Sequence, residues 1–387
     1  MTGATCETAM RDMGADAGRR LAARGRGVLL SAVLSGLVAL AGVSALPRSA
    51  AADLDYSRFW PAALAGFAVP ASDALVQTMP ALATAIEIAC TGGSPEPFEE
   101  AFTQAVGAAA RLTVLRAGAL ADDNRLERIA FIPDGRGVVR RQVTRLIAER
   151  DPTALDAARL REKSVALQGL TALEWVAFDK DGKIVLADRG EEGAYRCAYA
   201  ASLSERLGAT ARELRAAFET PSGQTALLLA PGPDNALART HKEAAGFVFN
   251  AVMTSLELIR DQMLVPMVGE QGSAAGAARV PFSRSRNGAA YLAGAIDGLF
   301  RAVAAAGYAD GAAETVWIGN ALRFERDNAS KALAALPADL EAALADETAR
   351  GRLAYVLTVL TGLRTMLSGE LAGHLDFRGG FNALDGD

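Results

Sequence analysis

Apolar residues recur along most of this chain at spacings of three and four, and β-branched runs are short. This spacing places apolar side chains on one face of an α-helix. It predicts helices over residues 72–90, 95–121, 136–149, 163–178, 194–218, 236–264, 286–306, 312–334 and 351–372. Only Lys183-Ile-Val-Leu-Ala187 reads as extended, and it predicts a small β-hairpin near residues 183–190. The sequence therefore predicts an all-α protein.

A break in composition divides these predicted helices into two groups. The break runs from Thr220-Pro-Ser-Gly-Gln to Pro231-Gly-Pro-Asp-Asn235, and a second loose stretch covers residues 269–279. No repeat of fixed short period is present in the sequence, which argues against a solenoid. We therefore expect two packed helical bundles. The first covers residues 53–220 and contains the helix predicted at 163–178, and the second covers residues 236–387.

The first 52 residues have the three parts of a secretory signal peptide. A leader that contains Arg19 and Arg20 precedes an apolar run from Val28 to Leu46, and a small-residue stretch ends at Ala52. This order predicts export to the periplasm or cell envelope with cleavage after Ala52. The alternative is a membrane anchor, because the run is nearly long enough to span a bilayer. Pro47 and the Ala-x-Ala site favour cleavage, and the route, Sec or twin-arginine, stays open.

Loss of this leader would change the formal net charge from −5 to about −8, because it carries six arginines and three acids. A mildly acidic mature chain argues against nucleic acid as a partner. We expect no membrane span in the mature chain, because no second apolar stretch is long enough. Cys90 and Cys197 would be its remaining cysteines, and an oxidising compartment favours a disulfide between them over two free thiols.

Several common catalytic sites are absent from the sequence. It has no H-E-x-x-H, no C-x-x-C, no phosphate-binding loop and no nucleophile elbow. His241 and His374 are the only histidines, and neither has a second metal ligand at helical spacing. A zinc site of nitrogen and sulfur ligands is therefore difficult to assemble.

The helix predicted at 163–178 has one narrow polar face in an otherwise apolar sequence. Ser164, Gln168 and Thr171 share this face, and Glu174 lies one turn beyond. A carboxylate on such a helix is expected to be buried and to need an arginine, a metal ion or a ligand as its partner. The arginines considered as partners in an internal ion pair are Arg128, Arg136, Arg140, Arg141 and Arg196.

Four segments together resemble the imelysin-like family of bacterial envelope proteins. They are Arg128-Ile-Ala-Phe-Ile-Pro-Asp-Gly-Arg136, the stretch from Lys163 to Glu174, Tyr195-Arg-Cys-Ala-Tyr-Ala200 and the ending Gly380-Phe-Asn-Ala-Leu-Asp-Gly-Asp387. The resemblance covers the whole mature chain. It implies two helical bundles with a site in the cleft between them, and an envelope role often linked to iron acquisition.

The family is classed among metallopeptidases because of a G-x-H-x-x-E motif. This chain has Gly169 and Glu174 of that motif, but Thr171 stands at the histidine position. Threonine is a poor metal ligand, and one glutamate alone cannot hold and activate a divalent ion. An ion that prefers oxygen ligands, such as ferric iron, would need Glu174 together with other carboxylates, for which Asp179, Asp385 and Asp387 are options.

Three functional hypotheses follow from this resemblance. The favoured one is a non-enzymatic binding protein that holds iron or another small ligand in the cleft. The alternatives are a metallopeptidase of the imelysin type and a helical scaffold for an envelope protein partner. No residue is assigned a catalytic role. The ligand-binding candidates are Gly169, Thr171, Glu174, Gln168, Arg128 and Arg196, and Glu174 is the candidate metal ligand.

Overall fold

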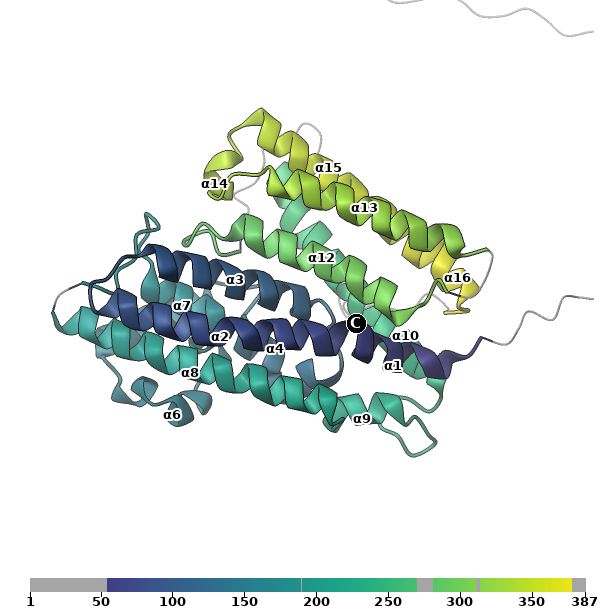
Figure 1. Cartoon of the computed structure of the whole chain (residues 1–387), viewed down its shortest axis with the longest axis horizontal. Helices are drawn as coiled ribbons and strands as arrows, with labels where there is room; N and C mark the ends of the chain where they lie inside the picture. The colour runs from purple at the N-terminus through teal and green to yellow at the C-terminus, as the bar shows by residue number, and fades with distance from the viewer. Residues whose placement is uncertain (1–53, 189, 270–280, 311–313, 378–387) are drawn as a thin grey trace, which may run out of the picture. The chain divides into compact units, whose positions relative to one another are not determined.

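The computed structural model describes residues 54–188, 190–269, 281–310 and 314–377, without the side chains of residues 341 and 342. Helices dominate these ranges, which confirms the all-α prediction (Figure 1). The α-helices are α1 (Phe59–Ala63), α2 (Val69–Cys90), α3 (Glu96–Thr113), α4 (Arg125–Ile129), α5 (Val138–Glu149), α6 (Ala157–Arg161), α7 (Gly169–Ala177), α8 (Glu191–Glu219), α9 (Gly223–Leu229), α10 (His241–Glu257), α11 (Val265–Val268), α12 (Gly288–Ala306), α13 (Val316–Ala334), α14 (Leu340–Ala343), α15 (Glu347–Thr365) and α16 (Ala372–His374).

Short turns of tighter or wider helix extend and connect these elements. The 3₁₀ turns are η1 (Tyr56–Arg58), η3 (Gly118–Leu120), η4 (Asp122–Asn124), η5 (Pro152–Leu155) and η6 (Val165–Leu167), and the π-helical segments are η2 (Leu64–Ala68), η7 (Leu258–Leu264) and η8 (Met366–Leu371). The π segments join α1 to α2, α10 to α11 and α15 to α16, so each pair continues as one rod.

The helix predicted from Lys163 begins later than the apolar pattern indicates. Ser164 caps the short turn η6, Gln168 is extended, and α7 starts at Gly169 with a backbone φ of 78°. A Cβ at Gly169 would lie 2.5 Å from the carbonyl oxygen of Arg128, so the chain there contacts the end of α4 directly. The prediction of one helix over 163–178 is therefore wrong in its first turn, because only glycine fits this contact.

The predicted hairpin near residues 183–190 is reduced to a single pairing. Within the described ranges, the extended pairing is one antiparallel bridge between Phe178 and Ile184. The Asp179 carboxylate accepts the backbone N–H groups of Asp181 and Lys183, and this closes the turn tightly. Helix α8 then begins at Glu191, so the chain has no room for a second strand.

Helix α2 packs against both α3 and α8, while α12 packs against α3 and α13 (Figure 1). Glycines allow α3 and α12 to approach closely. A Cβ at Gly294 would lie 2.3 Å from the Gly107 carbonyl oxygen, and one at Gly298 would lie 2.4 Å from that of Arg111. One continuous hydrophobic core therefore includes residues from Phe59 to Leu375.

Two apolar helical stretches, Tyr56–Cys90 and Gly288–Ala306, are long enough to cross a membrane by length and composition alone. In their most apolar windows, 50% and 61% of the residues are buried inside the protein. This burial is typical of core helices, which satisfy the same test.

The disulfide prediction is confirmed. Cys90 at the end of α2 is bonded to Cys197 in α8, with 5.7 Å between their Cα atoms. The described residues between 54 and 377 form one compact unit, and the division into bundles at residues 220–236 stays a prediction. The signal peptide predicted for residues 1–52 lies outside the described residues, as do the candidate ligands Asp385 and Asp387.

Candidate functional site

The Glu174 side chain lies at a junction between α7 and the segment that precedes α12. Ser285 donates two hydrogen bonds to its Oε1 atom, one from the backbone N–H at 2.9 Å and one from the hydroxyl at 2.8 Å. Glu174 is 6% exposed. Two donors on one oxygen orient the carboxyl group and fix its rotamer.

Burial raises the pKa of Glu174 to about 7, although the Ser285 hydrogen bonds and the charge of Arg284 both oppose this shift. Desolvation disfavours the charged carboxylate more than these partners favour it. The group therefore exchanges its proton near neutral pH, and such perturbed carboxyls are concentrated at functional sites.

Arg284 lies beside this carboxyl group without forming an ion pair to it. Its guanidinium stacks on the Trp175 ring with 3.9 Å to the centroid, and its Nη1 donates to the Phe178 carbonyl oxygen at 2.7 Å. Burial lowers the pKa of Arg284, and the charges of Glu174 and Asp179 counteract this shift. The guanidinium thus caps the carboxyl end of α7 and places a positive charge near Glu174.

Thr171 is buried and already hydrogen-bonded within the protein. Its Oγ1 accepts the backbone N–H of Phe131 at 3.1 Å, which anchors the extended segment after α4 to the first turn of α7. This is a structural contact between an extended segment and a helix. A histidine at position 171 would have to give up the hydrogen bond from the Phe131 N–H to bind a metal ion.

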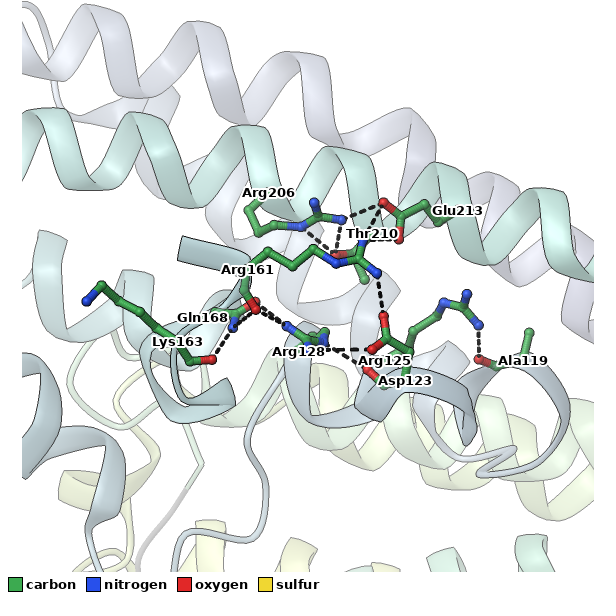
Figure 2. Close-up of polar contacts among 10 residues, drawn as sticks. All are labelled: Ala119, Asp123, Arg125, Arg128, Arg161, Lys163, Gln168, Arg206, Thr210 and Glu213. Carbon is green, nitrogen blue, oxygen red and sulfur yellow. Dashed lines mark hydrogen bonds and ion pairs between the residues drawn. The ribbon is translucent and has the colours of Figure 1, made fainter. Parts of the chain in front are cut away.

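Gln168 and Arg128 belong to a separate polar network, which Figure 2 shows. Gln168 is fully buried; its Oε1 accepts from Arg128 Nη1 at 2.9 Å, and its Nε2 donates to the Lys163 carbonyl oxygen at 2.9 Å. Arg128 also donates to the carbonyl oxygens of Asp123 and Arg161. These contacts fix the turn before α7 against α4.

The same network continues to α8 through charged side chains (Figure 2). Arg161 pairs with Asp123 at 2.7 Å and with Glu213 at 3.2 Å, and Arg206 pairs with Glu213 at 2.7 Å. The buried Arg206 also donates to Thr210. The guanidinium groups therefore find acids or carbonyls within the protein, so the network holds α4, α6 and α8 together.

The five arginines predicted as partners of Glu174 are bound or lie elsewhere. Arg128 binds Gln168, while Arg196 pairs with Glu192 and donates to the Val176 carbonyl oxygen. Arg136, Arg140 and Arg141 are exposed. The expectation of an ion pair between Glu174 and one of these arginines is wrong, because Arg128 and Arg196 bind other groups and the remaining three side chains are exposed.

The candidate metal site finds no further ligand in the described part of the chain. Asp179, an option for a second carboxylate, accepts two backbone N–H groups and shapes its own turn. The backbone hydrogen bond from Lys183 is the main cause that lowers the pKa of Asp179. Within residues 54–188, 190–269, 281–310 and 314–377, no group of three or more His, Cys, Asp or Glu residues is arranged to hold a metal ion.

The site residues that sequence reasoning missed are Arg284 and Ser285. They lie in Ser283-Arg-Ser-Arg-Asn287, which follows the loose stretch at 269–279 and has no helical periodicity. The signal that was present is two arginines and two serines in a short polar segment just before a long apolar helix. Nothing in that pattern indicates which buried acid they would contact.

The chain matches the family described as Imelysin (Peptidase M75) over residues 68–367. An imelysin-like protein from Psychrobacter arcticum 273-4 is similar in structure, with a TM-score of 0.64 and 18% sequence identity over 84% of this chain and 97% of that one. A protein from Parabacteroides distasonis ATCC 8503, provisionally described as an iron-regulated protein A precursor, has a TM-score of 0.51 and 14% identity over 81% and 95%. No curated protein sequence matches the chain.

Proposed function

The chain belongs to the imelysin family, and from this premise we propose that it is an exported cell-envelope protein that binds a small ligand and does not cleave peptides. The order of basic leader, apolar run and Ala-x-Ala site in residues 1–52 supports export. The Cys90–Cys197 disulfide is compatible with it, because such bonds persist in oxidising compartments.

The residues around α7 argue against peptide hydrolysis. A metallopeptidase site needs several protein ligands to hold one metal ion and lower the pKa of its bound water. Thr171, at the position of the family histidine, has its hydroxyl bound to the Phe131 N–H, and Glu174 is the one carboxylate nearby on α7. One oriented carboxyl group can contact a ligand, but it does not make such a metal site.

The Glu174 carboxyl group is the observation that carries the binding proposal. Ser285 holds Oε1, and within the described residues Oε2 has no hydrogen-bond partner. A carboxyl group with a pKa of about 7 can donate a hydrogen bond through Oε2 when protonated and accept one when ionised. We propose that Oε2 contacts the ligand, with Arg284 and Trp175 as the neighbouring charged and aromatic groups.

Iron stays one candidate for this ligand. The description of the Parabacteroides distasonis protein says that it is iron-regulated, which concerns its regulation and not what it binds. Glu174 would supply one oxygen ligand, and iron would need additional ligands from water or from a chelator such as citrate. Iron chelates and metal ions are therefore the first probes to use.

Calorimetric titration of the purified protein with ferric citrate, ferrous iron and zinc tests this proposal. We expect saturable binding of a probe that Glu174→Gln weakens at least about tenfold, the effect of losing one charged hydrogen bond. Glu213→Gln is the matched control, because Glu213 is a partly buried glutamate of the Figure 2 network. Equal binding by Glu174→Gln and wild type would contradict a role for this carboxyl group. Cleavage of unfolded casein with added zinc, lost in Glu174→Gln, would favour the metallopeptidase instead.

The scaffold alternative has one observation in its favour. Trp317 and Phe324 on α13 lie seven residues apart, which is about two helical turns, and they are 45% and 65% exposed. Exposed aromatic side chains on one helix face are typical of protein interaction sites. Pull-down from envelope extracts with wild type and with Trp317→Ser/Phe324→Ser tests this alternative. A partner that is lost only in the double variant would support it.

A further inference from the structure

A small cavity lies between the two halves of the chain, away from the Glu174 carboxyl group. Its volume is about 20 Å³, which is room for one or two water molecules or one small ion. Thr113 and Arg116 line it from the end of α3, and Ser255 and Tyr291 line it from α10 and α12. The cavity thus brings together polar side chains from three segments far apart in the sequence.

Arg116 supplies a positive charge to this cavity. Within the described part of the chain its guanidinium has no hydrogen bond and no ion pair, although the side chain is half-buried. Its backbone φ is 46°, in a region that a non-glycine residue seldom occupies. A half-buried charge without a partner is unfavourable unless a counter-ion or water compensates it.

Two residues with hydroxyl groups line the same cavity. The Ser255 Oγ atom is buried and has no hydrogen-bond partner, and Ser255 as a whole is 3% exposed. Tyr291 is buried, and its hydroxyl makes no hydrogen bond to any residue that the structure describes. Burial raises the pKa of Tyr291, so its hydroxyl keeps its proton and can donate it in a hydrogen bond.

These three groups share the chemistry of an anion site. We propose that the cavity binds one small monovalent anion, from chloride to formate in size, through the Arg116 guanidinium and the hydroxyls of Ser255 and Tyr291. None of the described residues that line the cavity is acidic. Water alone would satisfy the hydroxyl groups but would leave the Arg116 charge without a counter-ion. An anion would accept hydrogen bonds from the hydroxyl groups and would also act as the counter-ion of Arg116.

The cavity lies close to the residues that hold α7. Ala130 and Ile132 form part of its wall, and they flank Phe131, whose N–H donates to Thr171. An anion there would brace the extended segment after α4 against the C-terminal half of the chain. The proposal does not depend on ligand binding at Glu174, because the two sites share no residue.

Thermal unfolding in formate, chloride or bromide tests the proposal. Sodium gluconate, which is too large for the cavity, keeps the ionic strength constant. We expect a saturable rise in Tm for wild type, and binding at least about tenfold weaker for Arg116→Gln, which loses a charged contact. Arg150→Gln is the matched control, because Arg150 is exposed and has a similar φ of 48°. An equal response in Arg116→Gln and wild type, or a rise that does not saturate, would overturn the proposal.

Ser255→Ala separates anion binding from a structural role. Removal of an unsatisfied buried hydroxyl should leave Tm in gluconate unchanged or raise it, and should weaken the response to formate. If Ser255→Ala is as stable as wild type in gluconate and responds fully to formate, the proposed site is wrong. In crystals grown with bromide, an anomalous peak inside the cavity would support the proposal, and water there in its place would overturn it.

Discussion

Ser285 donates both its backbone N–H and its hydroxyl to a single carboxyl oxygen of Glu174, 111 residues away along the chain. This contact joins α7 to the segment before α12, so the two halves of the chain meet at a buried acid. The same carboxyl group has a pKa of about 7, which places its change of charge near neutral pH. Stability and proton binding are therefore coupled at one residue.

The pH dependence of stability follows from this pKa. The folded pKa lies above the unfolded value near 4.5, so between about pH 4.5 and 7 the unfolded chain releases a proton that the folded chain keeps. Stability is thus lost as the pH rises through this window. Glu174→Gln should be about as stable as wild type near pH 4.5 and more stable by up to about 3 kcal/mol at pH 8. Urea unfolding of both proteins at several pH values measures this difference.

Glu213→Gln is a control for that experiment, because its effect on stability at pH 8 should be opposite to that of Glu174→Gln. Burial alone would raise the pKa of Glu213, but the hydrogen bond and charge of Arg206 and the charge of Arg161 lower it. This carboxylate stabilises the fold above the unfolded pKa, so its loss should destabilise the protein at pH 8 and have little effect in acid. If both variants changed stability in the same direction with pH, the assignment of the Glu174 shift to burial would be wrong.

Gly169→Ala should destabilise the protein far more than Gly92→Ala. The two glycines have nearly the same φ, 78° and 79°, so the conformational penalty is matched. A Cβ at Gly92 meets no atom within 4 Å, whereas one at Gly169 would collide with the Arg128 and Ile129 carbonyl oxygens. We expect losses of about 1 kcal/mol at Gly92 and about 3 kcal/mol or more at Gly169. Chemical denaturation of the two variants distinguishes steric contact from backbone strain, and equal losses would rule out the contact.

The disulfide should contribute to stability by limiting the unfolded chain. It links residues 107 apart in sequence, and a loop of this length corresponds to about 5 kcal/mol in the chain-entropy model. Cys90→Ser/Cys197→Ser should lose about this much stability, and dithiothreitol should lower the stability of wild type but not of the variant. A wild type that does not respond to the reductant would show that the bridge is absent in solution.

The sequence predicts the long helices and the disulfide well, because apolar spacing and cysteine number are local or countable properties. It also predicts that Glu174 is buried, since the residues around it on α7 are apolar. It fails at Gly169, because hydrophobic periodicity contains no information on backbone φ. The break there depends on contact with α4, which is a tertiary feature.

The partner of Glu174 could not be predicted for a different reason. Five arginines near α4, α5 and α8 were plausible by charge, but arginine side chains are long and find carbonyl oxygens as readily as acids. Arg196 binds the carbonyl oxygen of Val176 on α7 and never contacts Glu174. Ser285 comes from a segment without periodicity, and only the folded chain brings it to the carboxyl group.

Titration of the Glu174 carboxyl carbon by NMR, in protein labelled with ¹³C-glutamate, tests the central claim most directly. Glu174→Gln assigns the resonance. We predict a pKa near 7 in wild type and a higher value in Ser285→Ala, because the Ser285 hydroxyl hydrogen bond favours the charged form. A pKa near 4.5, or one that Ser285→Ala leaves unchanged, would contradict a buried carboxyl group held by Ser285.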